Sequence, residues 1–180
     1  MWRHLTPAIA FALLGISLTW VLLRIGSHDL DVREIQSPLL GKPAPIFSLP
    51  SVLDAAPRVE SSHLLGTPYL INVWGSWCAA CREEHDTLLK IAAQHQVKLI
   101  GLDWKDDPSA ALAYLSELGN PYTEVASDQE GRVAIDWGVY GAPESFLVSA
   151  QGIVLYKFVG PLTEAVWNDQ FLTRLQTGAL

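Results

Sequence analysis

The segment from Tyr69 to Gln94 constrains the fold of this 180-residue chain more than any other feature of its sequence. Tyr69–Trp74 is an unbroken apolar run rich in aromatic and β-branched residues, which predicts a central strand buried on both faces. A helical pattern follows from about Ala79 to Gln94, with an apolar face made of Leu88, Leu89, Ile91 and Ala92. A buried strand that leads directly into an amphipathic helix indicates a layered α/β domain.

The rest of the chain alternates strand and helix patterns. We expect strands at Phe47–Leu49, Val97–Trp104 and Thr123–Ala126, and an antiparallel hairpin formed by residues 145–148 and 153–159. We expect helices at Pro108–Leu118, Gly131–Trp137 and Thr163–Leu175. Asp106 or Asp107 is available to cap the first of these helices, and Gly119 to end it. This order predicts a mixed sheet with helices on its faces.

Cys78 and Cys81 are the only cysteines of the sequence, and they stand at the junction of the predicted strand and helix. As a crosslink, a disulfide between them would stabilise little, because its loop is far shorter than the 15 residues for which a gain of about 3 kcal/mol is expected. At a helix N-terminus, however, unpaired N–H groups and the helix dipole lower the pKa of a thiol. We therefore expect a Cys78 thiolate that attacks a disulfide and a more buried Cys81 that resolves the mixed disulfide.

A metal site is the competing interpretation of the cysteine pair. Cys78, Cys81 and His85 supply at most three ligands, whereas a closed structural zinc site needs four and the sequence has no second cysteine pair. A mobile copper site is conceivable, since thiolates suit Cu(I). We expect His85 to be an exposed helix residue rather than a ligand, and we predict neither a metal nor another cofactor.

An uncharged stretch between Arg3 and Arg24 precedes the domain. Its core, Leu5–Leu23, would span about 28 Å as a helix, close to the bilayer hydrocarbon thickness of about 30 Å. A cleaved signal peptide would have a shorter apolar run and a small-residue cleavage site, which this sequence lacks. We therefore predict an uncleaved signal anchor, with the amino terminus inside and the domain outside the cytoplasm.

The distribution of charge limits the partners of the domain. Two of the 12 Lys and Arg lie in residues 1–25, which leaves 10 against 19 Asp and Glu, a net charge of −9 for the rest of the chain. Such a surface repels phosphate backbones and anionic headgroups, so nucleic acid is not an expected partner. We divide the chain into a membrane anchor (1–25), a polar linker (26–40) and one domain (41–180).

Five segments of the domain carry a resemblance to a known family. They are GKPAP at 41–45, NVWGSWCAACREEH at 72–85, GLDWKDD at 101–107, LGNPY at 118–122 and GVYGAPESF at 138–146. In these the chain resembles the membrane-anchored thioredoxin-like proteins of cytochrome c maturation, the DsbE/CcmG type. The resemblance implies a thioredoxin-like fold and a disulfide reductase that keeps apocytochrome c cysteines reduced, directly or through another maturation component.

The resemblance further implies a single-pass protein of the bacterial inner membrane whose domain faces the periplasm. Such a protein would receive electrons from a membrane thiol reductant of the DsbD/CcdA type. Nothing in the sequence demands an oligomer, and we expect a monomer. Two other functions stay open at this point, a general exported thiol–disulfide oxidoreductase and a non-enzymatic copper-delivery module.

The resemblance also assigns roles to individual residues. Pro143 would be a cis proline facing the cysteines, and the backbone at Ala142 would then pair with an extended substrate chain. Glu84 and Glu144 match acidic positions that the family places near the cysteine pair, where an acid can relay the proton that Cys81 must lose. An ordinary solvated charge is the alternative for both glutamates.

We state expectations for five further side chains. Trp77 and Tyr140 are candidates for binding substrate, with simple packing as the alternative for each. Trp104 and Trp137 are expected in the core or in the wall of a groove. Asn72 stands where many thioredoxins bury an Asp, and because an amide cannot relay a proton, that task would fall to Glu84, Glu144 or water.

Overall fold

The computed structural model describes residues 5–26, 37–53 and 58–177, which belong to two compact units, Met1–Ile35 and Gln36–Leu180. The first unit contains helix α1, Leu5–Gly26, over the predicted anchor. In the described part of the chain, no helix combines the length and the hydropathy that crossing a membrane requires. The membrane span that we predict at residues 5–23 therefore stays a prediction.

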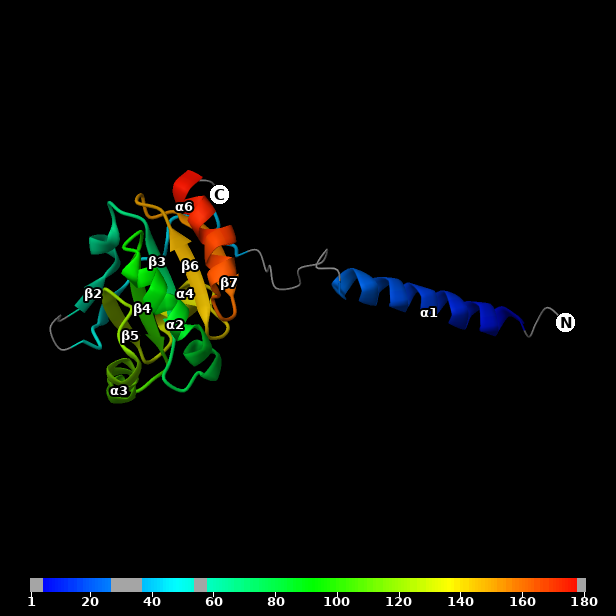
Figure 1. The fold of residues 1–180 in the computed structure, drawn as a ribbon, viewed down its shortest axis with the longest axis horizontal. Helices are drawn as coiled ribbons and strands as arrows, with labels where there is room; N and C mark the ends of the chain where they lie inside the picture. The colour runs from blue at the N-terminus through cyan, green and yellow to red at the C-terminus, as the bar shows by residue number, and fades with distance from the viewer. Residues whose placement is uncertain (1–4, 27–36, 54–57, 178–180) are drawn as a thin grey trace. The chain divides into compact units, whose positions relative to one another are not determined.

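The second unit is built on a five-stranded sheet with the order β5-β4-β3-β6-β7 (Figure 1). Its strands are β3 (Tyr69–Trp74), β4 (Lys98–Trp104), β5 (Glu124–Asp128), β6 (Glu144–Val148) and β7 (Val154–Val159). The pairs β3–β4 and β4–β5 are parallel, while β3–β6 and β6–β7 are antiparallel. The sheet is thus mixed, as predicted, and β3 lies at its centre.

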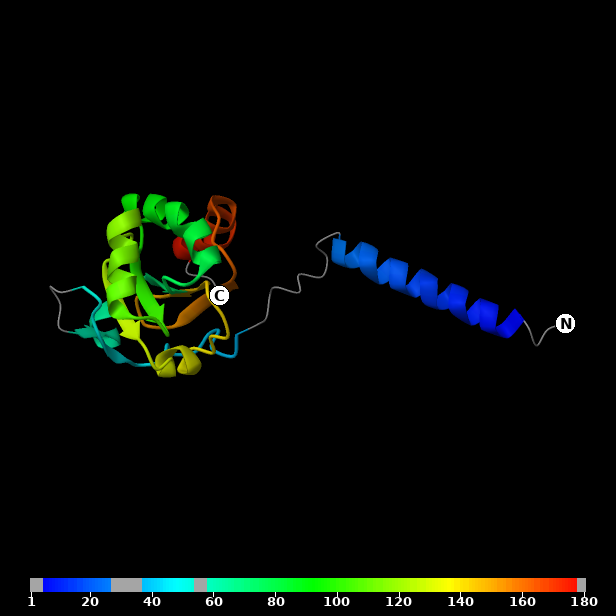
Figure 2. The same cartoon turned by 90° about the horizontal axis from the view of Figure 1, so that it is seen from below.

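Helices cover both faces of this sheet (Figure 2). They are α2 (Ala79–Ala93), α3 (Pro108–Leu118), α4 (Arg132–Asp136) and a C-terminal segment made of α5 (Glu164–Val166), the π-helical η3 (Trp167–Leu172) and α6 (Thr173–Thr177). A short hairpin of β1 (Ser48–Pro50) and β2 (Arg58–Glu60), followed by the 3₁₀ turn η2 (Ser61–Leu64), completes the unit.

Two apolar cores result from the alternation of side chains along the strands. Leu70 and Trp74 of β3 face one core together with the apolar residues of α2, α3 and the C-terminal segment. Ile71 and Val73 face the other core, which holds Trp137 beside α4 and Val59 of β2. The completely buried pattern of β3 confirms the prediction of a central strand covered on both sides.

Local sequence signals predict several element ends well. Helix α3 has the predicted bounds, the Asp107 carboxylate caps it by accepting from the backbone of Ser109 and Ala110, and Gly119 follows it with a φ of +92°. Strand β2 was not predicted, because Val59 is the single fully buried residue in a three-residue strand and so short a pattern carries no period.

The folded unit reaches upstream of Gly41. Residues 27–36 of the predicted linker lie outside the described residues, but Leu39 and Leu40 pack against the second core. The amide of Gly41 donates a hydrogen bond to the carbonyl oxygen of Val154 at 2.9 Å, and the amide of Val154 donates to Lys42 at 3.0 Å. The last residues assigned to the linker are therefore part of the domain's surface.

The packing of α2 on the sheet yields a first test. Leu88 is buried in the core beneath α2, so Leu88→Ala should lower the free energy of unfolding by about 2–5 kcal/mol. Leu89→Ala is the matched control, since this neighbour is only partly buried and should cost about 1 kcal/mol. Urea denaturation measures both variants, and equal losses would contradict this orientation of the helix.

Candidate active site

The cysteine pair lies where the central strand leads into a helix. Cys78 is the N-cap residue of α2, and its Sγ accepts a hydrogen bond from the backbone N–H of Cys81 at 3.1 Å. The two residues form a disulfide with an S–S distance of 2.12 Å. An N–H group aimed at the Cys78 sulfur from a helix N-terminus favours the negative charge of the thiolate once the pair is reduced.

The peptide bond between Ala142 and Pro143 is cis, as predicted. The carbonyl oxygen of Ala142 lies 3.5 Å from Sγ of Cys78. The loop that precedes β6 therefore touches the first cysteine, although 64 residues separate the two in the sequence.

A third loop holds the turn that precedes Cys78. The backbone N–H and the hydroxyl of Ser76 both donate to the carboxylate of Asp106, the hydroxyl at 2.9 Å. Nε1 of Trp77 donates to the carbonyl oxygen of Trp104 at 3.2 Å. From the sequence, Asp106 was predicted only as a possible cap of the helix that begins at Pro108. The available signal was its position just after β4, because the carboxyl ends of parallel neighbours β3 and β4 meet at one edge of the sheet.

Glu84 is almost completely buried, with 1% of its surface exposed, so the alternative of a solvated charge is wrong for this residue. It lies one turn beyond Cys81 on the buried face of α2. Its Oε1 accepts from Nδ2 of Asn72 at 2.8 Å, and its Oε2 accepts from the amide of Leu162 at 2.6 Å. Burial raises the pKa of Glu84 to about 7, although both hydrogen bonds act to lower it.

Glu144 is also buried, but in a different environment. Its carboxylate forms an ion pair with Nζ of Lys157 at 2.8 Å and accepts from the amides of Tyr140 and Gly141. Because successive strand residues point to opposite faces, Glu144 lies on the other face of the sheet from Ser145, which contacts Asn72. Through these hydrogen bonds, Glu144 holds the loop before the cis proline in place. Its role in proton transfer stays a prediction.

Two aromatic side chains are exposed near the cysteine pair. Trp77 is 54% exposed and Tyr140 is 55% exposed. Trp77 also lines a pocket of about 390 Å³ beside Cys78, together with Ser76, Ala79, Arg82 and Glu83.

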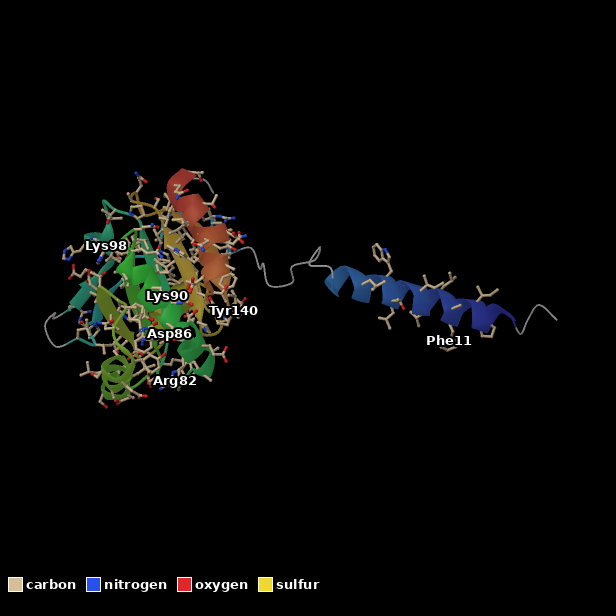
Figure 3. All side chains as sticks on the ribbon, viewed as in Figure 1. Phe11, Arg82, Asp86, Lys90, Lys98 and Tyr140 are labelled. Carbon is tan, nitrogen blue, oxygen red and sulfur yellow. A yellow bond between two sulfur atoms is a disulfide. The ribbon has the colours of Figure 1, made fainter. Side chains whose placement is uncertain are left out.

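Other side chains of the unit lie on the surface of α2 or in the core. Arg82, Asp86 and Lys90 form a row of charged side chains along the exposed face of α2 (Figure 3). Trp137 is fully buried and Trp104 partly buried, as expected for core and groove-wall residues.

His85 is buried, so the prediction of an exposed helix residue is wrong. Its Nε2 lies 3.0 Å from the carbonyl oxygen of Gly119, and its ring packs edge-on against Tyr114. The reason is helical spacing, which turns position 85 to the same buried side as Cys81. Among the described residues, no group of three or more His, Cys, Asp or Glu side chains is arranged to hold a metal ion.

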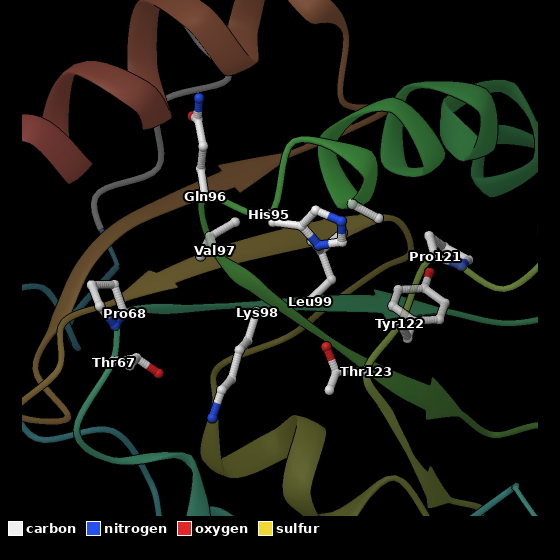
Figure 4. Close-up of a pocket in the computed structure, with 11 residues that line it drawn as sticks. Thr67, Pro68, His95, Gln96, Val97, Lys98, Leu99, Pro121, Tyr122 and Thr123 are labelled. Carbon is white, nitrogen blue, oxygen red and sulfur yellow. The ribbon is translucent and has the colours of Figure 1, made fainter.

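Another pocket, of about 490 Å³, lies at the opposite ends of the strands (Figure 4). Its walls come from the start of β4, the end of α2 and the segments that lead into β3 and β5, and they include His95, Lys98 and Tyr122. It contains neither cysteine. The chemistry that the sequence predicts is therefore located at the other edge of the sheet.

Asp103 is a buried acid close to the loop that holds Ser76. It pairs in register with Trp74 and has none of its surface exposed. Neither carboxylate oxygen has a hydrogen-bond partner in the described part of the chain. Burial, followed by the nearby carboxylate of Asp106, raises the pKa of Asp103 to about 8. At neutral pH this side chain is mostly a neutral carboxylic acid.

The chain is similar to known thiol–disulfide proteins. The family model described as Redoxin matches residues 39–170. The protein named thiol:disulfide interchange protein DsbE in Allochromatium vinosum is 47% identical over 157 residues, which cover 87% of each chain. The DsbE proteins of Pseudomonas aeruginosa and Escherichia coli (strain K12) are 45% and 40% identical, over 91% and 92% of this chain and 90% and 89% of theirs.

Solved structures agree with the sequence comparison. A Chlorobium tepidum protein named as a thiol:disulfide interchange protein DsbE matches with a TM-score of 0.66 and 25% identity, over 77% of this chain and 96% of that one. A secreted thiol-disulfide isomerase from Corynebacterium glutamicum, 22% identical, has the same fold with a TM-score of 0.65 over 74% of this chain and 85% of its own. The fold is therefore thioredoxin-like, as predicted.

The buried acid Asp103 predicts an unusual dependence of stability on pH. Its folded-state pKa of about 8 lies above the ordinary value of 3.8, so its ionisation opposes folding. Its contribution to stability is complete below about pH 4 and is lost as the pH rises to about 8. Asp103→Asn should therefore gain stability relative to the original chain across this range, by about 5 kcal/mol at pH 8, since each unit of the pKa difference contributes about 1.4 kcal/mol.

Urea unfolding of the oxidised protein at a series of pH values measures this gain. Asp86→Asn is the control, because Asp86 is an exposed residue on α2. If the free energies of unfolding of Asp103→Asn and the original chain changed in parallel with pH, ionisation of the Asp103 carboxyl would not oppose folding, and the prediction would be wrong.

Proposed function

The chain belongs to the Redoxin family and to its DsbE thiol:disulfide interchange proteins, and on this premise we propose that it reduces disulfides of apocytochrome c, or of a maturation partner, in the periplasm. It is a thiol–disulfide oxidoreductase, as its relatives and its cysteine pair indicate. One observation carries the proposal. Sγ of Cys78 lies at the N-terminus of α2 and against the backbone of Ala142, and Cys78 lines a surface pocket of about 390 Å³ from which an incoming chain can approach it.

Reduction proceeds in two exchange steps. The Cys78 thiolate attacks one sulfur of the substrate disulfide, a new S–S bond joins Cys78 to the substrate, and the second substrate sulfur leaves as a thiolate. The Cys81 thiol then loses its proton and attacks Sγ of Cys78, which releases the first substrate sulfur. The substrate gains two electrons, and the protein ends with the Cys78–Cys81 disulfide.

Glu84 is our proposed acceptor of the Cys81 proton. It lies one helical turn beyond Cys81, both side chains are buried, and its pKa of about 7 allows it to exchange a proton near neutral pH. Asn72 occupies the strand position where many thioredoxins carry an acid, and here its amide donates to Glu84 instead. The carboxylate is thus supplied by the helix rather than by the strand.

The surroundings of Cys78 suit an extended polypeptide as substrate. The backbone beside the cis proline can pair with such a chain by strand addition. Exposed Trp77 and Tyr140 offer apolar surfaces on which substrate side chains can pack. Copper delivery through Cys78, Cys81 and His85 loses its support, because the His85 ring is buried against Tyr114 and the Gly119 carbonyl oxygen.

We also propose that residues 5–23 anchor the protein in the inner membrane, where a reductant of the DsbD/CcdA type would restore the Cys78 and Cys81 thiols. The support comes from the sequence, which has no charged residue between Arg3 and Arg24. Helix α1 covers this run, and its described apolar residues, such as Phe11 and Leu14, are exposed. An exposed apolar helix is stable when another phase, such as lipid, covers it.

Trapping tests the substrate. Cys81→Ser removes the resolving thiol, so this variant should accumulate a mixed disulfide between Cys78 and a peptide that carries an oxidised cytochrome C-x-x-C-H motif. Cys78→Ser is the control and should trap nothing. Mass spectrometry after non-reducing electrophoresis identifies the adduct and, in cells, the natural partner. Capture of many unrelated proteins, with no component of cytochrome maturation among them, would favour a general oxidoreductase.

Extraction tests the anchor. The full chain should stay with the membrane pellet in alkaline carbonate, because an apolar helix of this length is not removed by breaking ionic contacts. A variant without residues 1–25 should move to the supernatant while it still reduces the peptide. A full chain that carbonate extracts would exclude integral anchoring by residues 5–23.

A further inference from the structure

We propose that Tyr122 is a positioning residue for disulfide exchange, because its hydroxyl holds the Asn72 amide in the orientation that presents an N–H to Glu84. The inference rests on the proposed function in one respect, the use of Glu84 as the acceptor of the Cys81 proton. Tyr122 precedes β5 and is 50 residues away from Asn72 in the sequence. Only the folded sheet brings the two side chains together.

Three hydrogen bonds define the orientation of the Asn72 amide. The Tyr122 hydroxyl donates to Oδ1 of Asn72 at 2.7 Å. Nδ2 of Asn72 donates to Oε1 of Glu84 at 2.8 Å and to the hydroxyl oxygen of Ser145 at 3.1 Å. All three bonds are buried, so water does not substitute for a lost partner.

This orientation favours the carboxylate form of Glu84. The amide has one accepting atom and one donating atom, and its accepting Oδ1 is occupied by the Tyr122 hydroxyl. When Oε1 of Glu84 carries a proton, its O–H needs an acceptor, and Asn72 can provide one only if its amide rotates by half a turn so that Oδ1 faces Glu84. This rotation would place Nδ2 against the Tyr122 hydroxyl. The Tyr122 hydroxyl hydrogen would then lose its buried acceptor. Tyr122 therefore opposes the turned-over amide and with it the protonated acid.

The Tyr122 hydroxyl stays a donor throughout the relevant pH range. Burial raises the pKa of Tyr122 well above its ordinary value, and the nearby acid Glu84 adds to this effect. The ring is also held in place, since it stacks on Trp74 with 5.6 Å between ring centroids. A Cβ at position 101 would lie only 3.0 Å from this ring, so Gly101 leaves the space that it fills.

The loop that carries Tyr122 is anchored at both ends. The backbone N–H of Tyr122 donates to Oδ1 of Asn120 at 2.9 Å, and that of Thr123 donates to Leu99 at 2.8 Å. The carbonyl oxygen of Gly119 lies 3.0 Å from Nε2 of His85. The active-site helix α2 and the loop thus meet at His85 as well as through the Asn72 amide.

Several groups surround Glu84 and bear on its titration. Helix α2 itself contributes the neighbouring His85 and, one turn away, Cys81. Strand β6 contributes the neutral Ser145, and the segment before α5 contributes the Leu162 amide. The other titratable side chains coupled to this cluster are Tyr114 on α3, Tyr122, and Asp103 on β4. The Tyr122–Asn72 contact is the one that determines which atom of the amide faces the carboxylate.

The carboxyl resonance of Glu84 tests the proposal directly. Carboxyl ¹³C NMR of the oxidised full chain in detergent micelles gives its titration midpoint, and Glu84→Gln assigns the resonance. Tyr122→Phe should move this midpoint upward by about one pH unit. The variant has no hydroxyl to donate to Oδ1 of Asn72, so the amide is free to rotate and to accept a hydrogen bond from the protonated Glu84. The rate at which Cys81 releases a model peptide from Cys78 should shift to higher pH by the same amount.

Tyr114→Phe is the matched control. Tyr114 lies beside His85 and Trp74, and its buried hydroxyl has no hydrogen-bond partner within the described residues. Removing that hydroxyl should leave the midpoint of Glu84 unchanged. An unchanged midpoint in Tyr122→Phe, or an equal shift in both variants, would overturn the proposal.

A measurement on the unaltered chain covers the case in which Tyr122→Phe does not fold. The side-chain amide resonances of Asn72 should move through the same midpoint as Glu84, because the amide turns as the acid gains its proton. Asn72 resonances that stay constant across that midpoint would equally overturn the proposal. Since the oxidised protein has no free thiol and no substrate is present, failure of the proposed reductase function would leave both titrations as predicted.

Discussion

The hydrogen bond from Asn72 to Glu84 is the interaction on which the arrangement of this site depends, because it joins the central strand to the helix that begins at Cys78. A buried carboxylate needs partners, and Glu84 finds one in the strand amide and another in the Leu162 amide before the C-terminal segment. The same bonds place an ionisable group one turn below Cys81. The contact that fastens α2 to the sheet therefore also sets the proton chemistry that we propose for the second exchange step.

Carboxylates also organise the loops around the first cysteine. Asp106 holds the turn that contains Ser76, and Glu144, neutralised by Lys157, holds the amides of the loop before the cis proline. Such groups are stable in a protein interior only when N–H donors or a cation satisfy them. Asp103 is the exception, because no N–H donor or cation satisfies its buried carboxylate among the described residues, and burial raises its pKa to about 8 and so favours the protonated acid.

Comparison of the sequence with the structure separates local signals from long-range ones. The bounds of β3 and α3, the cap at Asp107 and the hairpin of β6 and β7 follow from patterns within a few residues, and they were predictable. The burial of Glu84 and His85 was not, because both are polar residues on a helix whose apolar residues alone suggested its buried face. The hydrogen bond between Ser76 and Asp106 joins residues 30 positions apart, and the one between Tyr122 and Asn72 joins residues 50 positions apart. No pattern within a few residues predicts contacts between such distant segments.

By itself, the sequence determined the fold class, the cysteine pair at a strand-to-helix junction and the kind of reaction that such a pair performs, since these depend on hydrophobic periodicity, helix caps and thiol chemistry. The tertiary structure alone decided which acids are buried and what each one touches. It placed Glu84 against Asn72 beneath Cys81, and it set Glu144 on the opposite face of the sheet against Lys157. The physical reason is that the pKa of a carboxyl group and its role depend on desolvation and on donors brought from distant segments, which exist only after the sheet has formed.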